Sequence, residues 1–153
     1  LGRGARHPRK IRLPAAMNKL RGRITAIESN DHVSLVDVDV SGDSFTATLL
    51  ETPDDAPYLQ VGNAVQLLFK ETEVSLAKNL SGQISLRNRV QGRVRAVRSG
   101  GILSEVLLEY RGQTLTSIIT TRSIKRLDIK QGDEVEALIK ANEVSLMEVS
   151  SDD

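Results

Sequence analysis

The stretch GRVRAVRSGGILSEVLLEYRGQTLTSIIT, residues 92–120, decides the fold, because it repeats GRITAIESNDHVSLVDVDVSGDSFTATLL, residues 22–50, without a gap. At an offset of 70 residues, glycines, serines and β-branched residues keep their register, which indicates an internal duplication. The register continues to two identical Glu-Val-Ser-Leu segments at 73–76 and 143–146. Two units of one architecture are therefore predicted.

The repeat sets the domain boundaries. Residues 17–78 form a first module, 79–84 a short polar linker and 85–149 a second module. Residues 1–16 precede the repeat and carry five basic side chains and no acidic one. We interpret this segment as a leader, an expression tag or a linker, and we expect it to be disordered.

Each module is predicted to be all-β, because short β-compatible segments alternate with glycine-containing turns. Five strands and one short helix between the third and fourth strands suit a five-stranded OB-like barrel. The expected strands of the second module are 89–97, 102–110, 114–120, 134–141 and 143–149, with the helix at 121–127. Because so small a unit buries a limited core, we expect the modules to pack together or to oligomerise.

The composition narrows the class of protein. Of the 153 residues, 39% are hydrophobic and 27% are charged, as in globular chains. No apolar run approaches the length of a membrane span, and cysteine is absent, which fits a reducing cytoplasm. Residues 17–153 hold 16 basic and 20 acidic side chains, which argues against a broad nucleic-acid surface.

The second module resembles the molbindin and Mop (TOBE) family of molybdate- and tungstate-binding modules. That family opens with Ser-Ala-Arg-Asn before a hydrophobic residue and a glycine strand, and this chain has Ser-Leu-Arg-Asn at 85–88. The family's later signature is an apolar strand ending in Lys-Ala, which matches Lys140 and Ala141. A helix bearing Thr and Ser lies between them, as Thr120 and Ser123 do here. The tandem layout is similar to that of two-module molbindins.

This resemblance implies two tandem barrels that bind molybdate or tungstate where modules or subunits meet, for storage, buffering or sensing. Hydroxyl groups, backbone amides and a few fixed cations are suitable donors for a tetrahedral dianion. Family precedents imply a homo-oligomer, a trimer or a dimer, with no other cofactor and no membrane partner. Carried over by position, the expected oxyanion-binding residues are Ser85, Arg87, Thr120, Ser123, Lys140 and Ala141.

The first module departs from the family pattern. Ala15, Met17, Leu50 and Pro53 stand where the second module has Ser85, Arg87, Thr120 and Ser123. We expect this module to be mainly structural and to carry no complete site. It still offers Lys70, the counterpart of Lys140, to a shared site.

Two alternative functions remain open. Five arginines on the first strand of the second module would suit a nucleic-acid-binding OB domain, namely Arg87, Arg89, Arg93, Arg95 and Arg98. The chain could also be an excised C-terminal regulatory or assembly domain of a molybdate-responsive regulator or transporter ATPase. An enzyme is not expected, because His7 and His32 have no catalytic or metal-ligand spacing around them.

Overall fold

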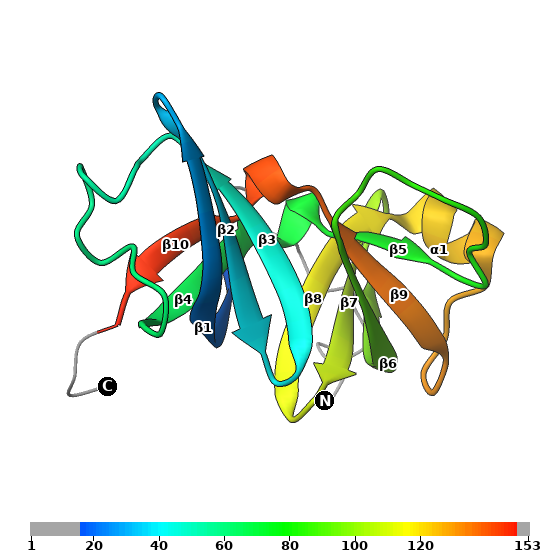
Figure 1. The fold of residues 1–153 in the computed structure, drawn as a ribbon. Helices are drawn as coiled ribbons and strands as arrows, with labels where there is room; N and C mark the ends of the chain where they lie inside the picture. Colours follow the sequence, from blue (N-terminus) through cyan, green and yellow to red (C-terminus); the bar gives the residue numbers. More distant parts are fainter. Residues whose placement is uncertain (1–15, 150–153) are drawn as a thin grey trace.

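The computed structural model describes residues 16–149, which form two five-stranded antiparallel sheets lying side by side (Figure 1). The leader, apart from Ala16, lies outside the described residues. The elements of the first module are β1 (Met17–Asn30), β2 (Val33–Val40), β3 (Asp43–Leu49), β4 (Ala64–Lys70), the 3₁₀ turn η2 (Glu71–Glu73) and β5 (Ser75–Ala77). Those of the second are β6 (Asn88–Ser99), β7 (Leu103–Tyr110), β8 (Gln113–Thr120), α1 (Thr121–Leu127), β9 (Glu134–Ile139), η3 (Ala141–Glu143) and β10 (Ser145–Glu148).

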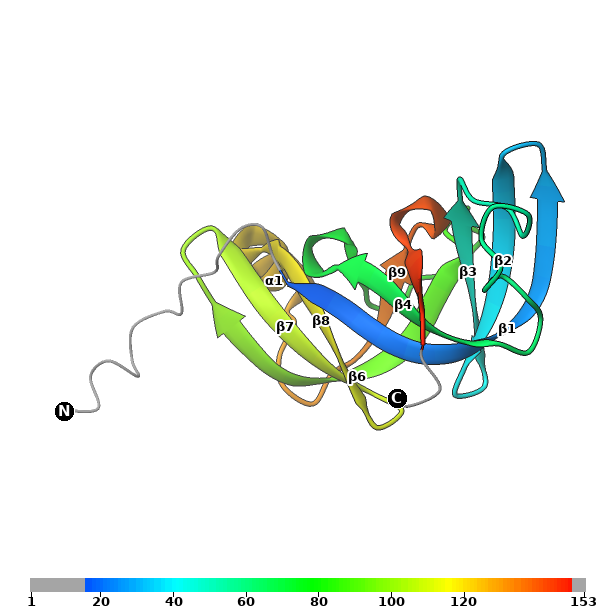
Figure 2. The same cartoon turned by 90° about the vertical axis from the view of Figure 1, so that its left-hand side faces the viewer.

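The two modules exchange their last strands. The sheet orders are β10-β4-β1-β2-β3 and β5-β9-β6-β7-β8, so each module completes the sheet of the other. The expectation that residues 143–149 close their own unit is therefore wrong. Both exchanged strands begin within the same Glu-Val-Ser-Leu segment, so the edge of either sheet meets the same residues whichever of the two strands pairs with it. Figure 2 shows the red strand β10 lying against β4, a strand of the other module.

One short helix was expected in each module, and the structure has it in the second. Thr120 is the N-cap of α1, accepting a hydrogen bond from the Ser123 amide at 3.0 Å. The equivalent stretch of the first module, residues 51–57, forms turns instead. Pro57 lacks an amide hydrogen that a helix over this stretch would use, and Pro53 and Pro57 disfavour helical torsion angles at the residues before them, Thr52 and Ala56. The Thr52 carbonyl accepts the Asp55 and Ala56 amides in one isolated turn.

A single hydrophobic core runs through both modules. Along β2, side chains alternate between buried and more exposed positions, as a half-buried strand requires. Phe45 of β3 and Tyr110 of β7, both fully buried, meet edge to face with their ring centroids 6.4 Å apart. Since these rings come from different modules, the modules are expected to unfold together.

Two buried asparagines join the modules in the same way on both sides. Asn18 of β1 donates to the Thr116 carbonyl and accepts the Thr116 amide, both at 2.8 Å. Asn88 of β6 donates to the Thr46 carbonyl at 3.0 Å and accepts the Thr46 amide at 2.7 Å. Each asparagine thus satisfies a buried backbone donor and acceptor of the other module, which fixes the start of β1 against β8 and of β6 against β3.

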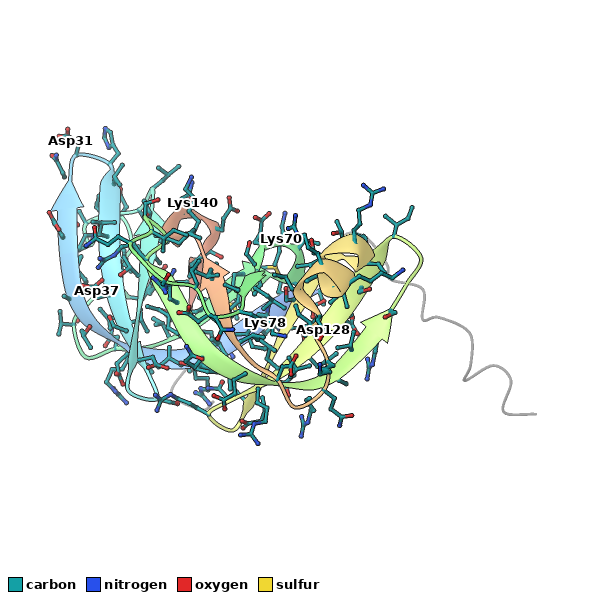
Figure 3. The ribbon with its side chains drawn as sticks, turned by 90° about the vertical axis from the view of Figure 1, so that its right-hand side faces the viewer. Asp31, Asp37, Lys70, Lys78, Asp128 and Lys140 are labelled. Carbon is teal, nitrogen blue, oxygen red and sulfur yellow. The ribbon has the colours of Figure 1, made fainter. Side chains whose placement is uncertain are left out.

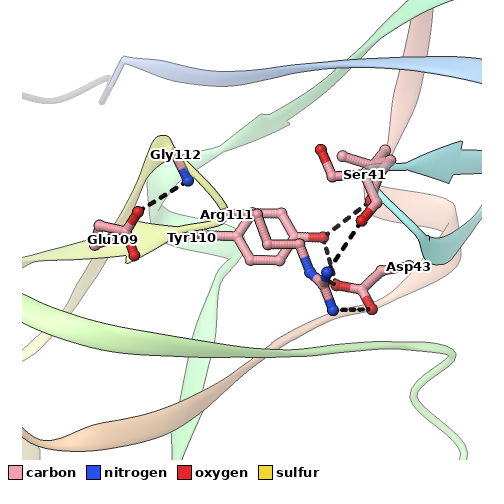
Figure 4. A network of polar contacts seen from close by, with 7 residues as sticks. Ser41, Asp43, Glu109, Tyr110, Arg111 and Gly112 are labelled. Atoms are coloured by element: carbon pink, nitrogen blue, oxygen red, sulfur yellow. Dashed lines mark hydrogen bonds and ion pairs between the residues drawn. The ribbon is translucent and has the colours of Figure 1, made fainter.

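A third contact joins the turns at the opposite edge of the interface (Figure 4). The Tyr110 hydroxyl donates to Asp43 Oδ2 at 2.7 Å, and burial together with this bond raises the pKa of Tyr110 above its ordinary value. Arg111 donates from Nε to Asp43 Oδ2 at 2.9 Å and from Nη1 to the Ser41 carbonyl at 3.1 Å. The β2–β3 turn is therefore held by the β7–β8 turn.

The exchanged strand β5 is anchored at its end by Lys78. Lys78 Nζ lies 3.1 Å from Asp133 Oδ2 and donates to the Asp128 carbonyl at 2.9 Å. The Lys130 amide and Lys78 hold the pKa of Asp133 below its ordinary value. The pair thus ties the first module's last residues to the turn before β9.

Gly22 and Gly92 provide a matched test of packing. A Cβ at Gly22 would lie 2.5 Å from Val38 Cγ1 and 2.7 Å from the Asp39 carbonyl oxygen, whereas at Gly92 the nearest atom is 3.3 Å away. We expect Gly22→Ala to destabilise the protein by about 2–3 kcal/mol in urea unfolding, because β2 must shift. Gly92→Ala should cost under about 1 kcal/mol. Equal costs for the two variants would contradict the close packing at Gly22.

Candidate functional site

The residues expected to bind an oxyanion lie in three places. Arg87, Lys140 and Ala141 lie where the second module meets β3, and Ser85 precedes Arg87 by two residues; we call this the second junction. Lys70 lies at the equivalent first junction, where Met17, Lys70 and Glu71 meet β8. Thr120 and Ser123 lie at the far end of β8.

The second junction is built by the pairing of β6 with β9. Asn88 is opposite Ile139, so the residues just outside this pair, Arg87 and Lys140, leave the sheet beside one another. Arg87 and Ala141 border one surface hollow, and η3 packs against β3. The two hydrogen bonds between Asn88 and Thr46 hold this end of β6 in place. The sheet and these bonds therefore position the backbone from which the Arg87 and Lys140 side chains project.

Three donors of the second junction are available to a ligand. The side chains of Arg87 and Lys140 are exposed and make no hydrogen bond or ion pair with any residue in 16–149. The half-buried Ala141 amide likewise has no acceptor among these residues. Ser85, also exposed, precedes Arg87 by two residues. Two cations and a free amide hydrogen suit a small oxyanion.

Carboxylates of the first module also face this hollow. Asp37 and Glu28 line it together with Thr46 and Thr48. The Thr46 hydroxyl donates to Asp37 Oδ1 at 2.7 Å. The sequence placed none of these residues at the site and indicated only a solvated strand face for Asp37, because they join the site through the packing of the two modules. The charge of Asp37 opposes binding of a dianion, and Arg87 offsets it.

Thr120 and Ser123 do not reach Arg87 within one chain. Thr120 is opposite Leu103, beside the turn at the end of the 12-residue β6, whereas Arg87 precedes the start of that strand. The two ends are separated by about 40 Å of extended strand. Thr120 donates to Ser123 Oγ at 2.9 Å and borders a hollow with Arg122 and Lys125.

Lys70 occupies the position of Lys140 in the other module. Figure 3 shows both lysines at the two 3₁₀ turns, on the same side of the molecule. Met17 is opposite Lys70, and Glu71 follows it. The offset of 70 residues pairs Glu71 with Ala141, so the sequence carried a signal for Glu71, although the sequence analysis did not name it among the departures of the first module.

The arginine stripe of β6 is largely neutralised by its neighbours. Arg89 forms a bidentate pair with Glu136, with contacts of 3.0 and 3.1 Å, and Arg93 and Arg98 pair with Glu134 and Glu105. Arg95 donates to the Thr114 hydroxyl. Phe45 and Tyr110 are buried and cannot stack on bases. Among the five stripe arginines, Arg87 is therefore the one without a hydrogen bond or ion pair within residues 16–149, and the stripe offers few free cations to a nucleic acid.

Two further features bear on the class of protein. In the part of the chain that the structure describes, no helix is long and apolar enough to cross a membrane. Across residues 16–149, no three histidine, aspartate or glutamate side chains gather as metal ligands. His32 is exposed at the β1–β2 turn, and His7 lies outside the described residues.

Comparison with known proteins gives a consistent result. The TOBE domain model matches the chain twice, over residues 14–76 and 84–146. Molybdenum-pterin-binding protein 3 of Clostridium pasteurianum is 43% identical over 65 residues, 42% of this chain and 96% of the relative. The molybdenum import ATP-binding protein ModC of Brucella abortus is 32% identical over 123 residues, which span 80% of this chain and 32% of ModC.

The two-module arrangement also has a solved counterpart. The molybdate-bound crystal structure of the cytoplasmic molybdate-binding protein ModG superposes with a TM-score of 0.80 at 28% identity. The superposition covers 88% of this chain and 98% of ModG. The similarity therefore extends over both modules and includes their relative placement.

Proposed function

The chain belongs to the TOBE domain family, and from this premise we propose that it is a binding protein for molybdate or tungstate. The unpaired donors of the second junction carry the proposal: Arg87, Lys140 and the Ala141 amide, with Ser85 beside them. A tetrahedral dianion is stabilised by such fixed cations and amides, whose charge-assisted hydrogen bonds are the strong ones. The similarity to molybdate-bound ModG supports this ligand class.

We propose a homo-oligomer, a trimer or a dimer, as the functional form. Thr120 and Ser123 lie too far from Arg87 to share its ligand within one chain. A second copy that brought its α1 end to the second junction would add their hydroxyl groups. Binding at such an interface would couple the ligand to assembly, so molybdate would stabilise the oligomer by mass action.

The proposed role is passive: storing, buffering or reporting the oxyanion in the cytoplasm. ModG is a cytoplasmic protein, which supports this location. The relatives named as binding proteins support a binding protein rather than an enzyme. A regulatory domain of a transporter ATPase is the second candidate, because the chain matches part of ModC.

Isothermal titration calorimetry with molybdate, and with sulfate as the control, tests the proposed function. We expect saturable binding of molybdate and a much weaker response to sulfate, which has the same charge and shape but is smaller. The oligomeric state is measured on the same sample by light scattering. Equal affinity for both anions, or no response to either, would contradict the proposed function.

Removing the negative charge of Asp37 should raise the affinity for molybdate. Asp37→Asn removes one negative charge from the hollow beside Arg87 and keeps an acceptor for the Thr46 hydroxyl. Molybdate should therefore bind about three- to tenfold more tightly at low ionic strength. Asp54→Asn, the same change of charge in the exposed loop before β4, is the control and should have little effect. Equal effects would mean that the ligand is not near Asp37.

A further inference from the structure

The first and second junctions have the same backbone geometry. Asn18 and Asn88 make equivalent pairs of hydrogen bonds to Thr116 and Thr46. Lys70 and Lys140 precede their 3₁₀ turns with nearly the same torsion angles, φ −68° and ψ 144° against φ −71° and ψ 140°. The backbone around both lysines is therefore alike, and differences in binding must come from the neighbouring groups.

The backbone donor of the first junction is already in use. The Glu71 amide donates to the Ala16 carbonyl at 3.1 Å. The equivalent Ala141 amide has no such acceptor within the described part of the chain. An amide that is hydrogen-bonded to its own backbone must lose that bond before it can bind a ligand. The second junction offers its amide without this loss.

The side chains of the two junctions also favour binding at the second junction. Met17, which has no hydrogen-bond donor, stands where the second junction has Arg87. Glu71, which adds a negative charge next to Lys70, stands where the second junction has Ala141. The first junction thus has one cation and a carboxylate on its 3₁₀ turn, whereas the second has two cations and faces the carboxylates of Asp37 and Glu28 across the hollow. Arg87 offsets one of these charges, and the first junction has Met17 in that position.

We infer that the second junction alone binds the oxyanion, and that Met17, Glu71 and the Ala16–Glu71 hydrogen bond close the first junction. This inference rests on the proposed function and adds to it the number of sites: the chain uses one of the two equivalent positions that its duplication created. Lys70, although placed like Lys140, then takes no part in binding.

Matched lysine variants of the full chain test the inference. Molybdate bound per chain is counted by equilibrium dialysis for the unmodified protein, Lys140→Ala and Lys70→Ala, with circular dichroism as a check of folding. We expect Lys140→Ala to weaken all binding by at least about 30-fold, and Lys70→Ala to leave the number of sites and the affinity within about twofold.

The possible outcomes separate the inference from the proposed function. A saturable site that Lys70→Ala removes would overturn the inference and leave the proposed function intact. No binding by the unmodified chain would overturn the proposed function itself. Ala141→Glu, which brings the carboxylate of the first junction into the second, provides an independent variant and should abolish binding. Unchanged binding by a folded Ala141→Glu protein would also overturn the inference.

Discussion

Replacing Arg87 with alanine should weaken molybdate binding by about 10- to 100-fold and leave the fold intact. The guanidinium is exposed and makes no hydrogen bond or ion pair with another described residue, so its removal leaves no buried group unpaired. A charge-assisted hydrogen bond to an oxyanion contributes about 1.5–3 kcal/mol, which corresponds to this change in affinity. Calorimetric titration of Arg87→Ala with molybdate measures the loss directly.

Arg93→Ala is the matched control for this prediction. Arg93 lies on β6, which begins just after Arg87; it is also exposed and pairs with Glu134 at 3.4 Å, away from the junction. Its removal should change the affinity for molybdate less than about twofold. If both arginine variants lose affinity equally, the effect comes from overall charge and Arg87 is not a ligand-binding residue.

Replacing Asn88 with alanine should destabilise the protein by about 2–4 kcal/mol, the largest effect on folding expected here. Asn88 is fully buried, and its amide bonds both the carbonyl and the amide of Thr46. Alanine would leave both backbone groups buried without a partner. The melting temperature should fall by roughly 10 °C, and molybdate affinity should also fall because Arg87 would lose its fixed position.

Asn30→Ala provides the control for Asn88→Ala. Asn30 is exposed at the β1–β2 turn, and its replacement should change the free energy of unfolding by less than about 0.5 kcal/mol. Asn18→Ala should resemble Asn88→Ala, because Asn18 makes the same pair of bonds to Thr116. A stable Asn88→Ala protein would show that the asparagines are not needed to hold the modules together.

Much of the fold could be predicted because its determinants are local or repeated. The 70-residue register predicted two modules, and the alternation of apolar residues predicted their strands. The exchange of β5 and β10 could not be predicted. Both strands begin in Glu-Val-Ser-Leu, so pairing within a module and pairing between modules look the same in the sequence. The missing helix of the first module could have been inferred from Pro53 and Pro57.

The two cations of the candidate site could be proposed from the sequence, whereas the residues around them could not. Arg87 and Lys140 come from a resemblance over short segments, and the pairing of β6 with β9 brings them together. The stripe arginines looked equivalent to Arg87 in sequence, but Arg89 and Arg93 are neutralised by Glu136 and Glu134 from a strand about forty residues later. Such partners depend on strand register, which sequence pattern alone does not determine.

The most direct test of the central claim is a crystal structure of the protein grown with tungstate, whose anomalous scattering locates the ion without ambiguity. We predict anomalous density at the second junction, within hydrogen-bond distance of the Arg87 guanidinium, the Lys140 side chain and the Ala141 amide. We predict none beside Lys70. Density confined to the first junction, or no ordered tungstate in crystals of a protein that binds it in solution, would contradict this assignment.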